Sequence, residues 1–122
     1  MKKYALLCVL MSMMSSAYAF EWVKIYENEE YIMFMDRISV LNALNKQQMT
    51  SNKMVWEKYL APSEMVVAHA KREIDCKNYR HRVVEMRFYN ISETELLEID
   101  KKAGKWNYFN KDSGNYAAIC KK

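Results

Sequence analysis

The chain has 122 residues, with 19 lysines and arginines against 15 acidic residues and a formal net charge of +4. This length allows one domain with a modest core, and one proline with two glycines leaves no flexible linker that would divide it. So small a charge excess demands no polyanionic partner, and we expect no nucleic-acid ligand.

The chain begins with the three parts of a secretory signal. A lysine pair is followed by an apolar run over residues 4–14, and small residues then stand at Ala17 and Ala19. The run is about 11 residues long, too short for the ~20 residues of a membrane span. We therefore predict a cleaved signal peptide over residues 1–19 and one domain without a transmembrane segment over residues 20–122.

The cysteine count indicates a disulfide. Cys8 lies in the predicted signal, which leaves Cys76 and Cys120 as an even pair. In an exported, oxidising compartment an isolated pair predicts a bond, and two buried free thiols are the alternative. Closing this loop is worth about 4 kcal/mol in the chain-entropy model.

Short runs rich in β-branched and aromatic residues predict strands through most of the chain. In the first half we expect strands at Glu21–Glu27, Tyr31–Asp36 and Lys53–Tyr59. Asp36–Val40 is expected to continue irregularly, and Asn42–Asn52 to be turn-forming with at most one helical turn. Pro62 ends the third strand because proline cannot donate to a sheet.

Two long strands follow, Val66–Cys76 and Tyr79–Asn90, joined by a tight turn. Alternation places Cys76 on an apolar, inward face that only Arg72 interrupts. The sulfur of Cys76 is therefore expected to meet another element packed on the sheet.

The last third predicts an edge strand and a helix. Thr94–Ile99 has the acidic character of a charge-protected edge strand. Asp112 and Ser113 indicate a helix N-cap, and Tyr116 and Cys120 then lie on one helical face. We expect a short helix whose buried side carries the cysteine and which the disulfide ties to the sheet.

No arrangement of residues predicts catalysis, a cofactor or a metal site. The histidines of the mature chain, His69 and His81, fall on outward strand faces and are expected at the surface. Their spacing matches no zinc signature, and Gly104 and Gly114 are too far apart for a phosphate-binding loop. With both mature cysteines oxidised, no free thiol remains to act as a nucleophile. We predict a protein that is not an enzyme.

Positive residues gather on the two long strands and their turn, which we call the basic hairpin. The candidate ligand-binding residues are Lys71, Arg72, Lys77, Arg80, Arg82 and Arg87. Such a surface suits polyanions or acidic protein segments, and a solvated strand face with interleaved carboxylates is the alternative. Arg80 and Arg82 share parity with Val84 and Met86, so a bulge or the sheet's edge must turn the arginines outward.

Several blocks of residues together resemble one known family. They are Trp22, Tyr31 with Asp36–Ser39, Val55-Trp56, Lys71 with Ile74–Cys76 and Tyr79, Arg80 and Arg82, Phe88-Tyr89, Trp106, and Ser113 with Ala118–Cys120. The chain resembles the surface-adhesin protein E family of Gram-negative bacteria over nearly its whole mature length. The Ile74–Cys76 block paired with the terminal Ile119-Cys120 is the most specific part of the match.

This resemblance implies an α+β fold, with an antiparallel sheet of about six strands and a disulfide-tied C-terminal helix. It also implies binding to host extracellular-matrix or serum proteins rather than catalysis. Surface members can be lipid-anchored, whereas no cysteine follows the expected cleavage site here. The alternative is a periplasmic, envelope-associated structural or partner protein without host ligands. We expect an exported protein, in the periplasm or at the cell surface, with secretion from the cell as the alternative. The sequence predicts no oligomeric state.

Overall fold

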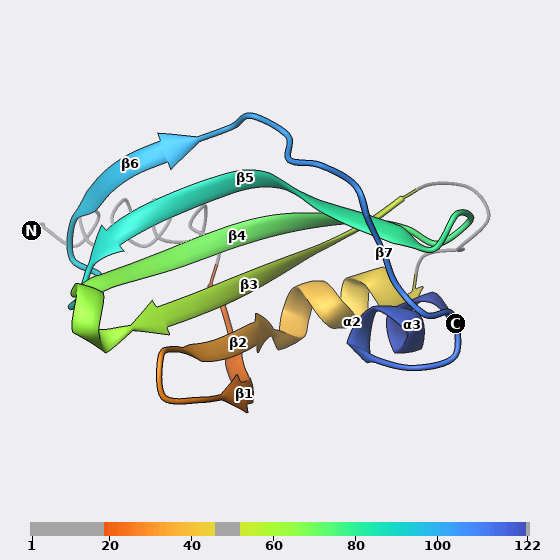
Figure 1. Cartoon of the computed structure of the whole chain (residues 1–122), viewed down its shortest axis with the longest axis horizontal. Coiled ribbons are helices and arrows are strands. Elements are labelled where there is room, and N and C mark those ends of the chain that lie inside the picture. The colour runs from red at the N-terminus through yellow and green to blue at the C-terminus, as the bar shows by residue number, and fades with distance from the viewer. Residues whose placement is uncertain (1–18, 46–51, 122) are drawn as a thin grey trace, which may run out of the picture.

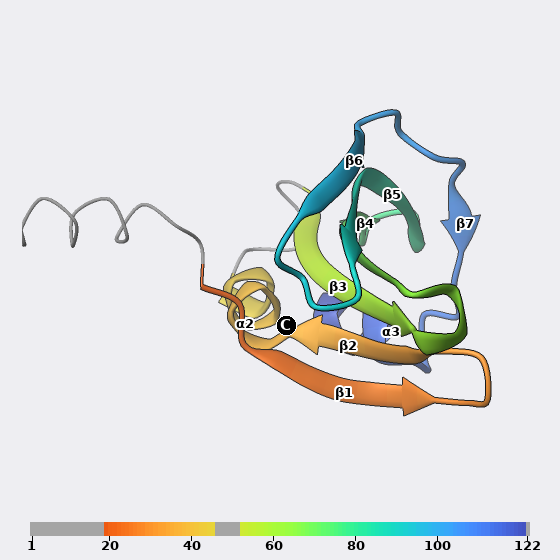
Figure 2. The ribbon, with the colours of Figure 1, turned by 90° about the vertical axis from the view of Figure 1, so that its left-hand side faces the viewer.

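A curled antiparallel sheet dominates the computed structural model, which describes residues 19–45 and 52–121. Its strands follow the order β1-β2-β3-β4-β5-β6, and a short β7 pairs with β5 (Figure 1). Figure 2 shows how the strands curl into a half-barrel. The elements are β1 (Trp22–Glu27), β2 (Ile32–Asp36), α2 (Arg37–Asn45), β3 (Lys53–Ala61), the 3-10 turn η1 (Pro62–Glu64), β4 (Val66–Asp75), β5 (Arg80–Asn90), β6 (Leu96–Asp100), β7 (Asn107–Tyr108) and α3 (Asn115–Cys120).

The six strands predicted from residue patterns are all present, and the predicted antiparallel sheet is confirmed. The two-residue β7 was not predicted, because so short a strand has no alternation to recognise. Pro62 ends β3 as expected and opens η1.

The segment after β2 is a helix, so the prediction of an irregular continuation was wrong. Helix α2 covers Arg37–Asn45, and residues 46–51 of the expected turn lie outside the described residues. The Asp36 carboxylate accepts the backbone N–H of Ser39 at 3.0 Å, the bond of a helix N-cap. The Asp36-x-x-Ser39 spacing was a readable start signal for this helix.

A bulge in β5 decides which side chains point inward. Lys71 of β4 pairs with Glu85, but the next residue, Arg72, pairs with Val83, so Val84 is an extra residue on β5. Of the two expected ways to turn Arg80 and Arg82 outward, a bulge or the sheet's edge, the structure shows the bulge. The same shift sends His81 to the inner side of the sheet.

The predicted disulfide is confirmed. Cys76 follows β4 and bonds Cys120 at the end of α3, with 5.4 Å between the two Cα atoms. The expected N-cap was wrong, since Gly114 stands at that position with a φ of 96° and no side-chain cap. Gly114 adopts this positive φ without steric cost because glycine has no Cβ.

The core lies between the inner face of the sheet and the two helices. Its buried members are Met35, Ala43, Val55, Ile74, Cys76, Ile119 and Cys120. We call the face that carries Val55 and Ile74 the inner face, and the face that carries Trp56 and Lys71 the outer face. Several charged side chains are also buried, and they belong to the candidate site.

Candidate functional site on the outer face and the charged cluster beneath it

Four residues of the basic hairpin come together on the outer face. They are Lys71, Arg80, Arg82 and Arg87. The strand register places Arg80 and Arg82 near the turn between β4 and β5, and Lys71 and Arg87 farther along the same face. Lys77 lies in the exposed turn between these strands. Arg72 is separated from all of them because it points to the inner face.

Carboxylates on the same strands neutralise the three arginines of this face. The ion pairs are Arg80 Nε to Asp75 Oδ2 at 2.8 Å, Arg82 Nε to Glu73 Oε1 at 2.9 Å and Arg87 Nε to Glu85 Oε2 at 2.5 Å. Within the described part of the chain, Lys71 and Lys77 have no ion pair. The outer face therefore carries both signs of charge rather than a strong positive field.

Tryptophan rings fix the positions of the same arginines. Trp106 packs against Arg80 and Arg82, whose guanidinium carbons lie 4.1 and 4.2 Å from its ring centroid. Arg87 lies 4.9 Å from the ring centroid of Trp56. Guanidinium groups stack well on indole rings, so each arginine is oriented by a ring and a carboxylate together. We call these five residues the arginine–tryptophan cluster.

Arg72 was predicted to be a ligand-binding cation of the basic hairpin, but its side chain lies in the interior. Its Nε donates to Glu57 Oε1 at 2.8 Å, and its Nη2 donates to the Tyr59 hydroxyl at 3.2 Å. Only 9% of Arg72 is exposed, and Glu57 is fully buried. The parity that Arg72 shares with Ile74 was the signal for this placement.

The Glu57 carboxylate is fully supplied with donors. Besides Arg72, it accepts the Tyr59 hydroxyl at 2.9 Å and the Tyr116 hydroxyl at 2.5 Å. Burial, followed by the Glu57 charge, raises the pKa of both tyrosines well above their usual range, so both remain donors. Burial lowers the pKa of the Arg72 guanidinium, but Glu57, Tyr116 and Tyr59 together outweigh burial and raise that pKa. Because Tyr116 belongs to α3, this cluster fastens the helix to the sheet.

His81 belongs to the same cluster, so its expected surface position was wrong. Its Nδ1 lies 2.8 Å from Nη1 of Arg72 and accepts that guanidinium N–H. Its ring packs on Tyr116 at a centroid distance of 4.5 Å. Burial, and next the charge of Arg72, lowers the pKa of His81, which favours the neutral acceptor.

His69 lies on the outer face as predicted, but it is buried, so its expected surface exposure was wrong. Its Nε2 lies 3.1 Å from Oε1 of Glu93, and its Nδ1 has no hydrogen-bond partner among the described residues. Its ring packs against Trp22 at 5.0 Å and Tyr89 at 4.6 Å between centroids. Burial lowers the pKa of His69 although Glu93 opposes the shift. Tyr89 comes from the neighbouring strand β5, whereas Trp22 comes from β1, at the other edge of the sheet, and strand parity does not reveal that contact.

Lys53 is a buried cation that the sequence reading missed. It is fully buried and its Nζ donates to the backbone oxygen of Ile119, in the last turn of α3, at 2.9 Å. A cation at this position satisfies an unpaired helix carbonyl. Burial lowers the pKa of the Lys53 amine. Its parity with Val55 was the available signal, but a lysine at a strand end usually faces water.

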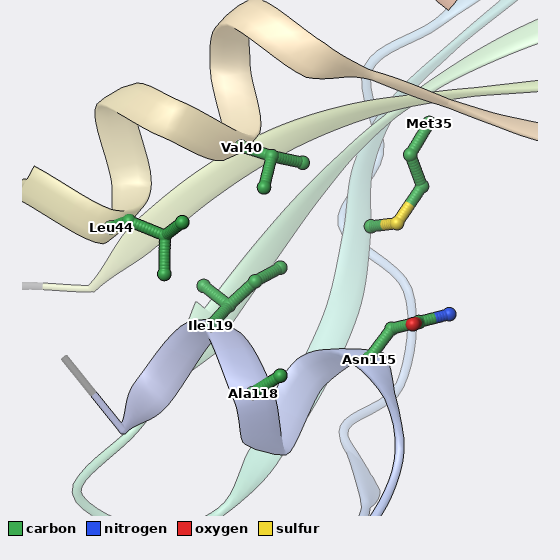
Figure 3. Close-up of a pocket in the computed structure, with 6 residues that line it drawn as sticks. All are labelled: Met35, Val40, Leu44, Asn115, Ala118 and Ile119. Atoms are coloured by element: carbon green, nitrogen blue, oxygen red, sulfur yellow. The ribbon is translucent and has the colours of Figure 1, made fainter. Parts of the chain in front are cut away.

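An apolar pocket of about 240 Å³ lies between α2 and α3 (Figure 3). Its lining consists of Met35, Val40, Leu44, Asn115, Ala118 and Ile119. This lining holds no ionisable group for chemistry. Over residues 19–45 and 52–121 there is no group of three potential metal ligands, and no helix there is long and apolar enough to cross a membrane.

The family model of surface-adhesin protein E matches residues 22–121. The chain belongs to the surface-adhesin protein E family. The match runs from the first residue of β1 to the end of α3, so it includes both the arginine–tryptophan cluster and the disulfide. Membership in the protein E family implies a non-enzymatic, adhesin-like binding protein that is exported to the surface. No curated protein and no solved structure matched the chain.

Proposed function

We propose that this member of the protein E family is an exported, non-catalytic protein that binds a host extracellular-matrix or serum protein through its outer face. The observation that carries the proposal is the arginine–tryptophan cluster. Tryptophan and arginine are enriched among the residues that dominate protein–protein binding energies. Here the three arginines keep about a third of their side-chain surface exposed.

The balance of charge favours a protein partner over a polyanion. A polyanion needs an unneutralised positive field, whereas each arginine of this face is paired with a carboxylate. A protein surface that carries both signs of charge complements such a face better. Lys71 and Lys77 add two cations whose charges are available to an acidic segment of the partner.

The rigidity of the cluster supports binding in a second way. Long side chains usually lose rotamer freedom when they enter an interface, at a cost of about 0.5–1.5 kcal/mol each. Arg80 and Arg82 are already fixed between carboxylates and Trp106 in the free protein. Much of that cost is therefore met on folding rather than on binding.

Export is supported by the disulfide and by the signal-like residues 1–19. The Cys76–Cys120 bond fits an oxidising compartment. Residues 1–18 lie outside the described part of the structure, so the signal peptide rests on its sequence pattern.

Two experiments test the proposal. Mature protein is titrated onto immobilised vertebrate matrix and serum proteins at physiological salt, and we expect saturable binding to at least one of them. Protease treatment of intact cells is expected to degrade the surface-exposed protein. The host-binding proposal fails if no saturable binding is found, and protection until the outer membrane is opened would favour a periplasmic partner protein.

A further inference from the structure

We infer that the outer edge of β6 is a docking strand for an extended partner segment in which apolar and basic residues alternate. This goes beyond the outer-face proposal and does not depend on it. Strand β6 ends the strand order, and no described strand pairs with its free side. All five of its residues are exposed. An open edge offers unpaired backbone groups to an added strand.

The first observation in favour of a docking edge is that β6 exposes large apolar side chains. Leu96, Leu97 and Ile99 are exposed by 44%, 54% and 45%. Charged residues commonly protect an edge strand from unwanted pairing, and Glu98 and Asp100 fit that role. Protection does not explain three exposed aliphatic residues in a strand of five, whereas an added strand would cover them.

The register shows which side chains an added strand would meet. Ile99 lies opposite Arg87 and Leu96 opposite Tyr89, so both apolar residues continue the outer face. Glu98 lies opposite Phe88 and Asp100 lies opposite Met86, so both carboxylates are on the inner face. The edge therefore presents aliphatic residues on one face and carboxylates on the other.

These carboxylates select the occupant. In an antiparallel pair of two copies, a two-fold axis at Glu98 sets that residue against itself, and an axis at Ile99 sets Glu98 against Asp100. Like charges directly opposite one another destabilise a sheet. A segment with lysine or arginine at these positions instead forms opposite-charge pairs, while its apolar residues pack on Leu96 and Ile99.

The test uses full-length mature protein and two labelled eight-residue peptides, one alternating valine with lysine and one alternating valine with glutamate. Fluorescence anisotropy is expected to show binding of the lysine peptide, with the glutamate peptide at least about tenfold weaker at low salt. Amide hydrogen exchange is expected to slow in Leu96–Asp100 when the lysine peptide is present.

Matched charge changes separate this edge from general attraction. Glu98→Lys is expected to lower the affinity for the lysine peptide about five- to tenfold. Glu29→Lys, at the β1–β2 turn, is expected to leave this affinity unchanged. Unchanged thermal midpoints check the fold of both variants. The inference is overturned if neither peptide binds, if Glu98→Lys binds like the wild type, or if exchange slows elsewhere. A dimer that Ile99→Ser dissociates would identify a second copy as the occupant instead. Arg82→Glu changes an outer-face arginine that pairs with Glu73 of β4 and has no partner on β6, so it is expected to leave peptide binding intact. Failure here is therefore distinguishable from failure of the outer-face proposal.

Discussion

Arg72 on β4 donates its Nε–H to Oε1 of Glu57 on β3 across 2.8 Å, inside the half-barrel. Tyr116 of α3 donates to the other oxygen of the same carboxylate. The C-terminal helix is therefore fastened by a buried charged cluster as well as by the disulfide. This divides the basic hairpin into one cation that stabilises the fold and others that remain at the surface.

Removal of Arg72 should therefore cost far more stability than removal of a surface arginine. We expect Arg72→Ala to lower the free energy of unfolding by about 3 kcal/mol or more, because Glu57 would keep a buried charge without its cation. Arg82→Ala, whose ion pair is partly exposed, should cost about 1 kcal/mol. Urea denaturation measures both, and equal losses would contradict the assignment of Arg72 to the interior.

The histidines should make the fold sensitive to mild acid. The pKa values of His69 and His81 are lowered in the folded protein, so below the ordinary value of about 6.5 the unfolded chain binds more protons. Their contribution to stability is present above pH 6.5 and is lost as the pH falls toward their folded pKa values.

We expect the thermal midpoint to fall between pH 7 and pH 5.5. His81→Gln should make this fall smaller, since glutamine accepts the N–H of Arg72 without titrating. His69→Gln/His81→Gln should reduce the fall further. If the double variant has the same pH dependence as the wild type, groups other than these histidines are responsible.

Loss of the disulfide should weaken the attachment of α3. Cys76→Ser/Cys120→Ser is expected to lower the free energy of unfolding by roughly 2–5 kcal/mol, because the closed loop constrains the unfolded chain. The Lys53–Ile119 and Tyr116–Glu57 bonds remain in this variant, so we expect the domain to stay folded at 25 °C. Free thiols in wild-type protein from the periplasm, found by non-reducing mass spectrometry, would show that the bond does not form.

Processing should yield a mature chain that begins at Phe20. Ala17 and Ala19 fit the small-residue positions of a signal cleavage site. The Phe20 ring stacks on Trp22 with 4.6 Å between centroids, so the predicted new N-terminal residue packs against the folded domain. Intact-mass measurement of exported protein tests this, and a retained residues 1–19 segment or an acyl group on Cys8 would refute it.

Sequence patterns predicted the parts of this fold that local periodicity controls. The long strands, the Pro62 break and the cysteine pair each followed from pattern or spacing, and the bulge in β5 was one of the two alternatives that parity allowed. Helix α2 was missed because the Asp36 cap precedes a segment with only weak amphipathic character.

The candidate site was predictable only in part, because partners determine burial. The sequence predicted that the cations of β4 and β5 lie near one another. It did not predict that Trp106, from a later segment of the chain, packs on Arg80 and Arg82. His81 turned inward through the same bulge that turned the arginines outward. Glu57 and Lys53 were overlooked since a charged residue on a strand ordinarily faces water.

The most direct test of the outer-face account compares two charge-matched double variants. Lys71→Glu/Arg87→Glu alters the outer face, whereas Lys101→Glu/Lys102→Glu makes the same charge change in the exposed segment after β6. Each is titrated onto the matrix or serum protein that the wild type binds, and thermal midpoints verify folding. The account predicts roughly tenfold weaker binding for the outer-face variant and wild-type binding for its control. Wild-type binding by a folded Lys71→Glu/Arg87→Glu variant would contradict it.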